Sequence, residues 1–208
     1  TELVIPSKVD GFSVVSIGDR AFQGKLLESV SIPDSVVNIG SQAFADWGVN
    51  QGLSISTLRK VVLGDGVESI GAYAFRGAQI SEVNFPPKLT YLGHSAYEKS
   101  NVSRVSFSGA NLTEIFSGTF SQSKLKAISL PEGLLKIGEN AFYQTPLETL
   151  NLPSSLIDIG AYAFSGTKLV EVVIPNSVKN IGDEAFSYSK IKNLTLGLSL
   201  ETIGKNAF

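Results

Sequence analysis

The segment Ile137-Gly138-Glu139-Asn140-Ala141-Phe142 decides the fold, because its pattern Ile-Gly-x-x-Ala-Phe recurs along the whole chain. Seven copies keep all four marked residues and two are degenerate. Six of the eight steps between copies are 22 residues long, and the other two are 31 and 23. Self-similarity at a fixed period of this length is typical of a solenoid. The copies begin at Ile17, Ile39, Ile70, Leu92, Ile115, Ile137, Ile159, Ile181 and Ile203.

Each unit carries two further apolar segments. The alternation in Leu147–Leu152 predicts a short strand with one buried face, and the proline that follows, Pro153, fits the end of a strand in a continuous parallel sheet. A second apolar step, as in Leu156–Ile159, leads into the glycine, which we expect to permit a tight turn, and then into a single helical turn ending in Ala-Phe. One such unit cannot bury its own apolar face, so the units must stack.

The composition excludes several classes of protein. The 208 residues are 43% apolar and 17% charged, with a formal net charge of −2, which argues against a disordered chain and against phosphate-driven nucleic-acid binding. The absence of cysteine excludes disulfides, thiolate metal sites and cysteine nucleophiles, and His94 is the only imidazole. No apolar run is long enough for a membrane span. A chain that starts at Thr1 and has no methionine is expected to be a fragment of a longer protein.

The repeating unit resembles the BspA-type leucine-rich repeat over essentially the whole chain, and the opening Ile5–Val14 resembles the way such arrays begin. The resemblance implies an α/β repeat solenoid. It would be a right-handed curved array of about nine 22-residue units, with a parallel sheet and short helical turns. The array is expected to form a single domain over residues 1–208, with a loop insertion at 45–57. The resemblance also implies a bacterial cell-surface protein that acts in adhesion.

Because packing explains the buried columns, we expect function on the outward residues of the first strand in each unit and on irregular repeats. Those outward residues are small, polar and varied, which suits contact with a macromolecule better than a small-molecule pocket, although a solvated face with no partner would look the same. The insertion carries the only tryptophan, which either anchors an interface or packs on the core. The candidate ligand-binding residues are Trp47, Asn50, Gln51, Lys60, Val62, Glu82, Asn84, Arg104, Ser106, Thr149, Asn151, Glu171 and Val173.

Three other groups offer alternatives. His94 lies in an irregular repeat, where a lone loop imidazole is usually neither a ligand nor a pH sensor. Tyr91 and Tyr97 could add an aromatic contact surface there, unless Tyr97 simply replaces the core phenylalanine of its unit. Val15 and Val37 occupy a nominally outward column together with Leu135 and Ile157, which predicts either a stripe for weak self-association or a column covered by the following turn.

Catalytic groups are poorly represented. Asp34 and Asp65 share a column, and Glu148 lies diagonally from Glu171, but neither pair has a third ligand or a histidine beside it. A calcium ion at Asp34 and Asp65 would lack most of the six to eight oxygens that it needs. The sequence also has no nucleophile elbow and no phosphate-cradling glycine loop. We therefore predict no enzymatic activity, no cofactor and no metal.

The leading hypothesis is a non-enzymatic, extracellular protein-binding module, part of a bacterial surface adhesin that contacts host matrix proteins or other cells. Nucleic acid and a membrane span in this chain are not expected. The first alternative is a structural spacer that displays other domains. The second is a carbohydrate-active enzyme of the β-helix kind.

Overall fold

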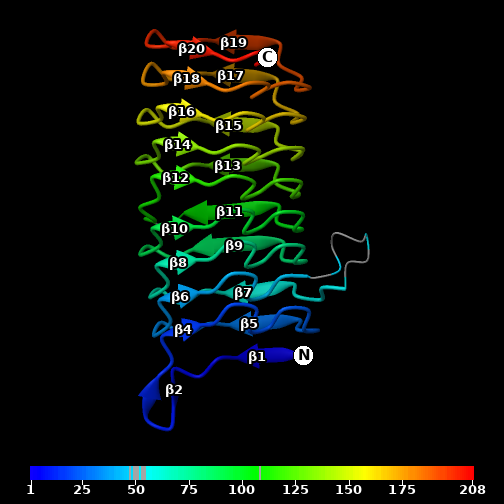
Figure 1. Ribbon diagram of the computed structural model, residues 1–208, viewed down its shortest axis with the longest axis vertical. Coiled ribbons are helices and arrows are strands. Elements are labelled where there is room, and N and C mark those ends of the chain that lie inside the picture. The colour runs from blue at the N-terminus through cyan, green and yellow to red at the C-terminus, as the bar shows by residue number, and fades with distance from the viewer. Residues whose placement is uncertain (47, 49–51, 53–54, 108) are drawn as a thin grey trace.

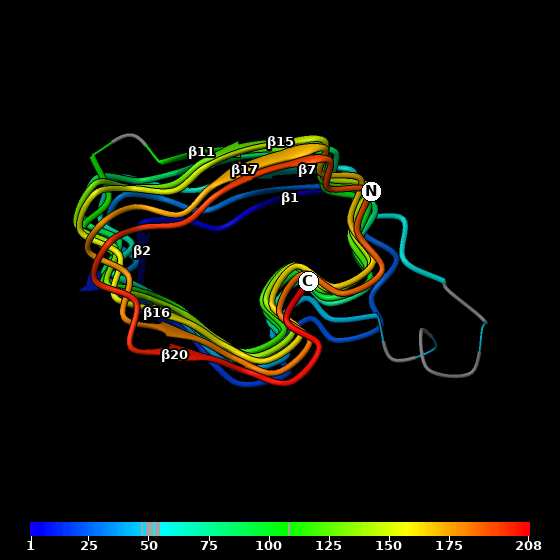
Figure 2. The ribbon, with the colours of Figure 1, turned by 90° about the horizontal axis from the view of Figure 1, so that it is seen from above.

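The computed structural model describes residues 1–46, 48, 52, 55–107 and 109–208. Within them the chain winds into a parallel-sheet solenoid of about eight turns, in which each coil contributes two short strands (Figure 1). Figure 2 looks along the stack from the C-terminal end, and there the chain circles anticlockwise while it rises toward the viewer, so the coil is right-handed. The coils form an almost straight column in the view of Figure 1, whereas in Figure 2 the middle strands on one side of the coil stand further out than those at either end, so the array curves gently.

Two parallel faces lie on opposite sides of the flattened coil (Figure 2). We call them the first-strand face and the second-strand face. The first-strand face consists of β1 (Glu2–Val4), β5 (Ser29–Ser31), β7 (Lys60–Val62), β9 (Glu82–Phe85), β11 (Arg104–Phe107), β13 (Ala127–Ser129), β15 (Thr149–Asn151), β17 (Glu171–Val173) and β19 (Asn193–Thr195). The second-strand face consists of β4 (Ser16–Ile17), β6 (Asn38–Ile39), β8 (Ser69–Ile70), β10 (Tyr91–Leu92), β12 (Glu114–Ile115), β14 (Lys136–Ile137), β16 (Asp158–Ile159), β18 (Asn180–Ile181) and β20 (Thr202–Ile203).

A single column of aromatic rings runs through the core. Successive rings stack with centroids 5.1 to 5.9 Å apart and planes within 18° of parallel. Tyr97 is fully buried in this column. It therefore replaces the core phenylalanine of its unit, as one of the two predictions for this residue stated, and it does not form an aromatic contact surface. The column consists of Phe22, Phe44, Phe75, Tyr97, Phe120, Phe142, Phe164, Phe186 and Phe208.

The predicted helical turn is wrong, because the described residues contain no helix. The residue before the motif alanine has a positive φ in every coil, as at Tyr162 with φ 56°, and a left-handed residue cannot continue a right-handed helix. The amides of Tyr162 and Phe164 donate to Asp183 and Ala185 of the next coil instead of to residues four positions back. The turn therefore extends the bonding between coils, and the fold is a β-solenoid and not an α/β one.

The motif glycine is needed for close approach and not for its φ, which corrects the tight-turn expectation. A Cβ atom on Gly160 would lie 2.7 Å from the amide nitrogen of Glu139 and 2.8 Å from the carbonyl carbon of Gly138, both in the preceding coil. Gly18 belongs to the first copy of the motif, and a Cβ there would meet nothing within 4 Å. The coils therefore touch backbone to backbone at this corner.

The one-residue insertion between the copies at Leu92 and Ile115 opens a seam in the second-strand face. The strands β4, β6, β8 and β10 form one sheet, and β12, β14, β16, β18 and β20 form another, with no ladder between β10 and β12. Phe116 occupies the glycine position at this boundary, whereas at Gly93 and Gly138 in the neighbouring copies a Cβ atom would lie 2.7 Å from a backbone nitrogen of the preceding coil. The widest ring spacing of the aromatic column, 5.9 Å between Tyr97 and Phe120, lies at the same boundary.

The opening segment forms a hairpin of β2 (Lys8–Val9) and β3 (Phe12–Ser13), which projects from the first coil (Figure 1). Asp10 and Gly11 connect the strands with φ values of 51° and 83°, as a two-residue hairpin turn with two left-handed positions requires. The hairpin is the only antiparallel pairing among the described residues.

Candidate interaction surface

The structure places ten of the thirteen candidate residues together on the first-strand face. In β7, β9, β11, β15 and β17 they are the first and third strand residues, which point outward, and all are exposed except the half-buried Ser106. Parallel pairing in register aligns them in two columns, as where Arg104 lies beside Glu82 and Asn151 beside Ser129. Trp47, Asn50 and Gln51 lie outside the described residues. The ten are Lys60, Val62, Glu82, Asn84, Arg104, Ser106, Thr149, Asn151, Glu171 and Val173.

Most polar side chains of the first-strand face are not bonded to their neighbours. The Arg104 guanidinium donates to Glu82 at 3.3 Å, and the Ser106 hydroxyl donates to Asn84 at 2.6 Å. Within the described part of the chain, no other outward side chain of this face has a hydrogen-bond or ion-pair partner. A new partner could therefore replace the water on these groups without breaking side-chain bonds within the protein.

The second-strand face is different, because its outward side chains bond to one another from coil to coil. Lys136 pairs with Glu114 at 3.2 Å, and Asn180 donates to Asp158 at 2.6 Å while its own carbonyl accepts from Thr202 at 2.7 Å. Any partner that bonds to these side chains would have to displace these contacts.

Three shallow hollows lie along the first-strand face, with volumes of about 450, 330 and 750 Å³. They lie over the boundaries β7–β9, β11–β13 and β15–β17, where neighbouring strands are in contact but form no ladder. The largest is lined by Glu148, Thr149, Asn151, Glu171 and Val173, among others. These hollows are open to solvent and make the face uneven, as a surface that contacts a macromolecule can be. They do not enclose a small ligand.

The base of the insertion is fixed by Asp46, a residue that the sequence reasoning missed. Its side chain is 3% exposed, and its carboxylate accepts from the amides of Gly48, Ile55 and Ser56 at 3.0 to 3.2 Å. A carboxylate placed directly before an insertion, where several other coils have glycine, was the available signal.

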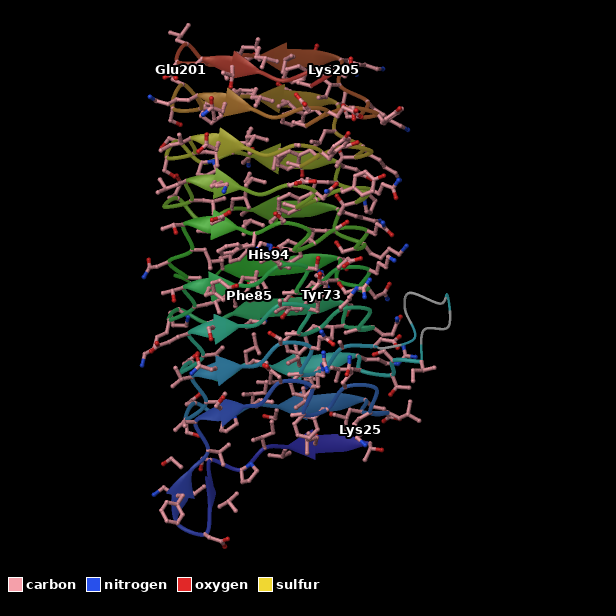
Figure 3. The ribbon with its side chains drawn as sticks, viewed as in Figure 1. Lys25, Tyr73, Phe85, His94, Glu201 and Lys205 are labelled. Carbon is pink, nitrogen blue, oxygen red and sulfur yellow. The ribbon has the colours of Figure 1, made fainter. Side chains whose placement is uncertain are left out.

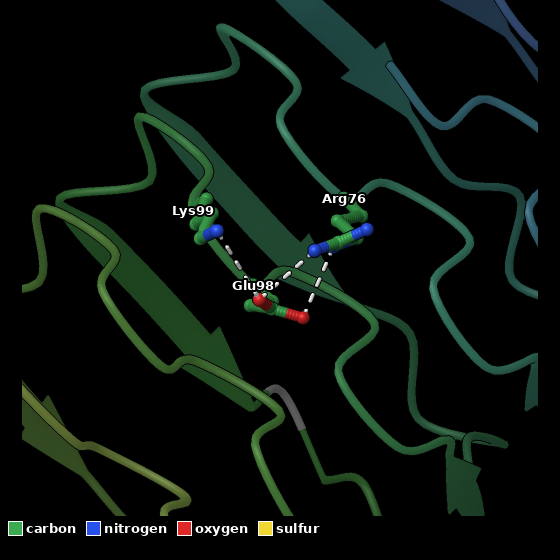
Figure 4. A network of polar contacts seen from close by, with 3 residues as sticks. All are labelled: Arg76, Glu98 and Lys99. Carbon is green, nitrogen blue, oxygen red and sulfur yellow. Dashed lines mark hydrogen bonds and ion pairs between the residues drawn. The ribbon is translucent and has the colours of Figure 1, made fainter. Parts of the chain in front are cut away.

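A charged cluster occupies the corner next to Asp46 (Figure 4). Arg76 donates to both carboxylate oxygens of Glu98 at 3.0 and 3.2 Å, and Lys99 lies 4.0 Å from the same carboxylate. The Arg76 guanidinium also lies 5.5 Å from the centre of the Tyr73 ring. The ion pair of Arg76 and Glu98 was not predicted, although two opposite charges, each one residue after the motif aromatic in successive coils, indicate such a contact. These groups satisfy one another and join two coils.

The remaining alternatives give less organised arrangements. His94 is exposed and packs its ring edge against Phe116, 5.0 Å away, and Tyr73 and His94 come from the turns of successive coils (Figure 3). Tyr91, 37% exposed, also contacts Phe116. The Asp34 carboxylate accepts from the amide of Asp65 at 2.9 Å and so forms a coil-to-coil link.

The apolar column that includes Val15 and Val37 is neither a continuous stripe nor fully covered. Val15 and Leu135 are exposed, whereas Val37 and Ile157 are half-buried. Among the described residues, no three acidic or imidazole side chains gather as a metal site would require. No helix there is long and apolar enough to span a bilayer.

The comparisons with known proteins agree with this architecture. The family described as the BspA type leucine rich repeat region matches six copies in the chain, over residues 15–56, 50–169 and 135–208. A leucine-rich repeat protein from Bacteroides ovatus, 23% identical, aligns over 100% of this chain and 72% of its own with a TM-score of 0.59. The pneumococcal vaccine antigen PcpA, 22% identical, aligns over 95% and 72% with a TM-score of 0.51.

Comparison with curated proteins finds no match. The two structural similarities establish the shared fold, and the family match covers nearly the entire sequence. This chain therefore belongs to the BspA-type leucine-rich-repeat family.

Proposed function

We propose that this chain is a non-enzymatic protein-binding module that uses its first-strand face as the recognition surface. The observation that carries the proposal is the contrast between the two faces. The outward groups of the second-strand face bond to one another, whereas Lys60, Thr149, Asn151 and Glu171 on the other face have no side-chain partner within the described residues. Donors and acceptors that are bonded only to solvent can bond to a partner without first breaking side-chain bonds within the protein, which the groups of the second-strand face cannot do.

The module acts at a bacterial cell surface as part of an adhesin, with host or partner-cell macromolecules as its ligands. Membership of the BspA-type family supports this location, and the similar fold of PcpA, described as a pneumococcal vaccine antigen, agrees with it. The insertion at 45–57, held at its base by Asp46, adds a specificity element beside the solenoid.

The test is a binding screen against host matrix proteins and intact partner cells with two matched variants. Asn151→Arg places a large charged group on the first-strand face, and Thr113→Arg adds the same group next to β12 on the opposite side. We expect Asn151→Arg to abolish binding and Thr113→Arg to leave it unchanged. A ligand whose binding withstands Asn151→Arg and Val173→Arg would contradict the assigned surface, and a chain that binds nothing would support the spacer alternative.

A further inference from the structure

The outward residues of the first-strand face are arranged symmetrically about the line between β11 and β13. In the three pairs of strands nearest this line, the strands equally far from it carry the same third residue, and the fourth pair, β5 and β19, carries Ser31 and Thr195. Val62 in β7 corresponds to Val173 in β17, Asn84 in β9 to Asn151 in β15, and Ser106 in β11 to Ser129 in β13. The first residues are complementary at the outermost of these pairs, where Lys60 in β7 corresponds to Glu171 in β17.

A two-fold axis along this line brings each strand of one copy onto the counterpart of that strand in the other copy. A second copy laid face to face, rotated about an axis parallel to the strands between β11 and β13, places its β17 over β7 of the first copy. Each lysine at position 60 then meets a glutamate at position 171 of the other copy, and Val62 meets Val173. Arg104 meets Ala127 and Glu82 meets Thr149, so no like charges oppose each other.

We propose that the first-strand face binds a second copy of this chain in this antiparallel arrangement, so that the module recognises itself. The inference rests on the proposed function, since it names the partner of the same surface. An exposed face with a self-complementary charge pattern is a geometric condition for an isologous dimer, in which each contact occurs twice.

The charges also select the register. Shifting the axis onto β11 would place Arg104 over its own symmetry copy, and shifting it onto β13 would place Glu82 over Glu171. Turning the second copy so that both stacks run parallel would reverse its strands, place Lys60 over Val62 and Glu171 over Val173, and so remove the pairing of opposite charges. Like charges in direct opposition are repulsive, so the antiparallel register centred between β11 and β13 is the favoured one.

The shape of the molecule allows this contact. The column is nearly straight in the view of Figure 1, and the first-strand face forms the upper side of the coil in Figure 2. Hairpin β2–β3 lies away from this side in Figure 2. In Figure 2 the middle strands of this face stand slightly further out than those at either end, so two copies approach most closely at β11 and β13, and the long side chains of Lys60 and Glu171 extend across the wider gap beyond them.

The size of the face sets the expected strength. Nine strands at about 4.8 Å spacing and three to four residues of width give roughly 40 by 12 Å, or about 500 Å² per copy. This area is below the roughly 800 Å² per partner of a standard stable interface. The hollows at β7–β9 and β15–β17 also fall opposite each other and leave room for water. The dimer is weak in solution and becomes effective when many copies are displayed together.

The test uses charge reversal at the two ends of the symmetric pattern. Sedimentation velocity over a concentration series measures association in solution, and clustering of beads coated with the chain measures it in multivalent form. We expect the unmodified chain to self-associate in both assays. Lys60→Glu alone and Glu171→Lys alone each create two like-charge contacts and weaken association by about tenfold or more.

An equal mixture of the Lys60→Glu and Glu171→Lys chains restores association. In the mixed dimer both positions 60 and 171 are acidic in one chain and basic in the other, so each of the two contacts again joins opposite charges. The double variant Lys60→Glu/Glu171→Lys also self-associates. Lys88→Glu, in the turn after β9, makes the same change in net charge away from the face and leaves association unchanged.

The proposal is overturned if the unmodified chain stays monomeric and its beads do not cluster, or if the mixture fails to restore what the single variants lose. These outcomes are separable from failure of the proposed function. A monomeric chain that binds a foreign ligand through Asn151 and Val173 refutes self-recognition alone, whereas ligand binding unaffected by all face variants refutes the recognition surface itself.

Discussion

At the scale of single residues, the motif glycine shows how neighbouring coils limit side-chain size. We expect Gly160→Ala to destabilise the protein by about 1–3 kcal/mol, because the new methyl group would lie 2.7 Å from a backbone nitrogen that cannot move alone. Gly18→Ala is the matched control, since the same methyl group meets nothing within 4 Å there, and we expect it to stabilise by about 0.5 kcal/mol. Urea denaturation of both variants measures the difference. Equal effects at the two positions would refute the close-approach explanation.

The hydroxyl of Tyr97 is a second residue-scale feature with a measurable cost. It is fully buried in the aromatic column and has no hydrogen-bond partner among the described residues, and burial raises the pKa of this phenol above its ordinary value. Tyr97→Phe removes a buried, unsatisfied polar group and keeps the ring, so we expect a gain of about 1 kcal/mol in the free energy of unfolding.

Tyr162→Phe provides the comparison for Tyr97, because the Tyr162 hydroxyl donates to Glu184 at 3.1 Å near the surface. Its loss should cost no more than about 0.5 kcal/mol. A destabilised Tyr97→Phe protein in the same urea titration would show that the buried hydroxyl has a partner such as ordered water.

At the scale of the structural elements, the apolar spacing predicted the strands well and the turns poorly. Alternation in Leu147–Leu152 correctly indicated β15, and the prolines do stand outside the strands, since the carbonyls of Pro153 and Pro175 accept bonds from turn amides. The turn was misread because Arg20 and Tyr162, which adopt positive φ, are residue types that carry no preference for it. Stacking between coils imposes that conformation, and a single unit does not reveal it.

The position of the candidate surface could be predicted from the sequence, but the bonding of its side chains could not. Period-two alternation identifies which residues of a strand point outward, and ten candidates therefore lie on one face. Whether those outward groups bond to each other depends on side-chain geometry between coils, which separates Lys60 from Lys136 although both are exposed strand lysines. Asp46 escaped detection because its role depends on amides nine and ten residues later in the chain.

The anchoring of the inserted segment by Asp46 can be tested directly. Asp46→Ala removes the acceptor of three backbone amides at the base of the insertion, and we expect a loss of about 2–3 kcal/mol together with faster proteolytic cleavage within 47–56. Limited proteolysis with mass-spectrometric mapping of the cuts measures this. Asp34→Ala is the control, because the Asp34 carboxylate accepts one exposed backbone amide and its loss should leave cleavage unchanged. Identical cleavage of both variants would remove Asp46 from its anchoring role.

At the scale of the whole molecule, successive coils are joined by backbone ladders on the first-strand face, on the second-strand face, or on both. The first-strand face lacks a ladder at β7–β9, β11–β13 and β15–β17, and the second-strand face lacks one at β10–β12. These gaps never coincide, so each boundary between coils keeps at least one ladder in addition to the stacked aromatic rings. In a solenoid each unit touches only its neighbours, and such staggering prevents any boundary from separating the molecule into two independent parts.

The boundary between the coils of Leu92 and Ile115 should nevertheless open most readily. It combines the missing β10–β12 ladder with the widest spacing in the aromatic column, 5.9 Å. The amides of Gly138 and Gly160 donate to Ile115 and Ile137 of the preceding coils at 2.7 and 2.8 Å, whereas the amide of Phe116, at the same motif position, has no backbone acceptor among the described residues. Native-state hydrogen exchange should therefore show the Phe116 amide exchanging at least about tenfold faster than the other two, since local opening there breaks fewer bonds. Equal protection at the three amides would mean that the seam is closed in solution, and that the extra residue before Ile115 is absorbed without weakening the stack.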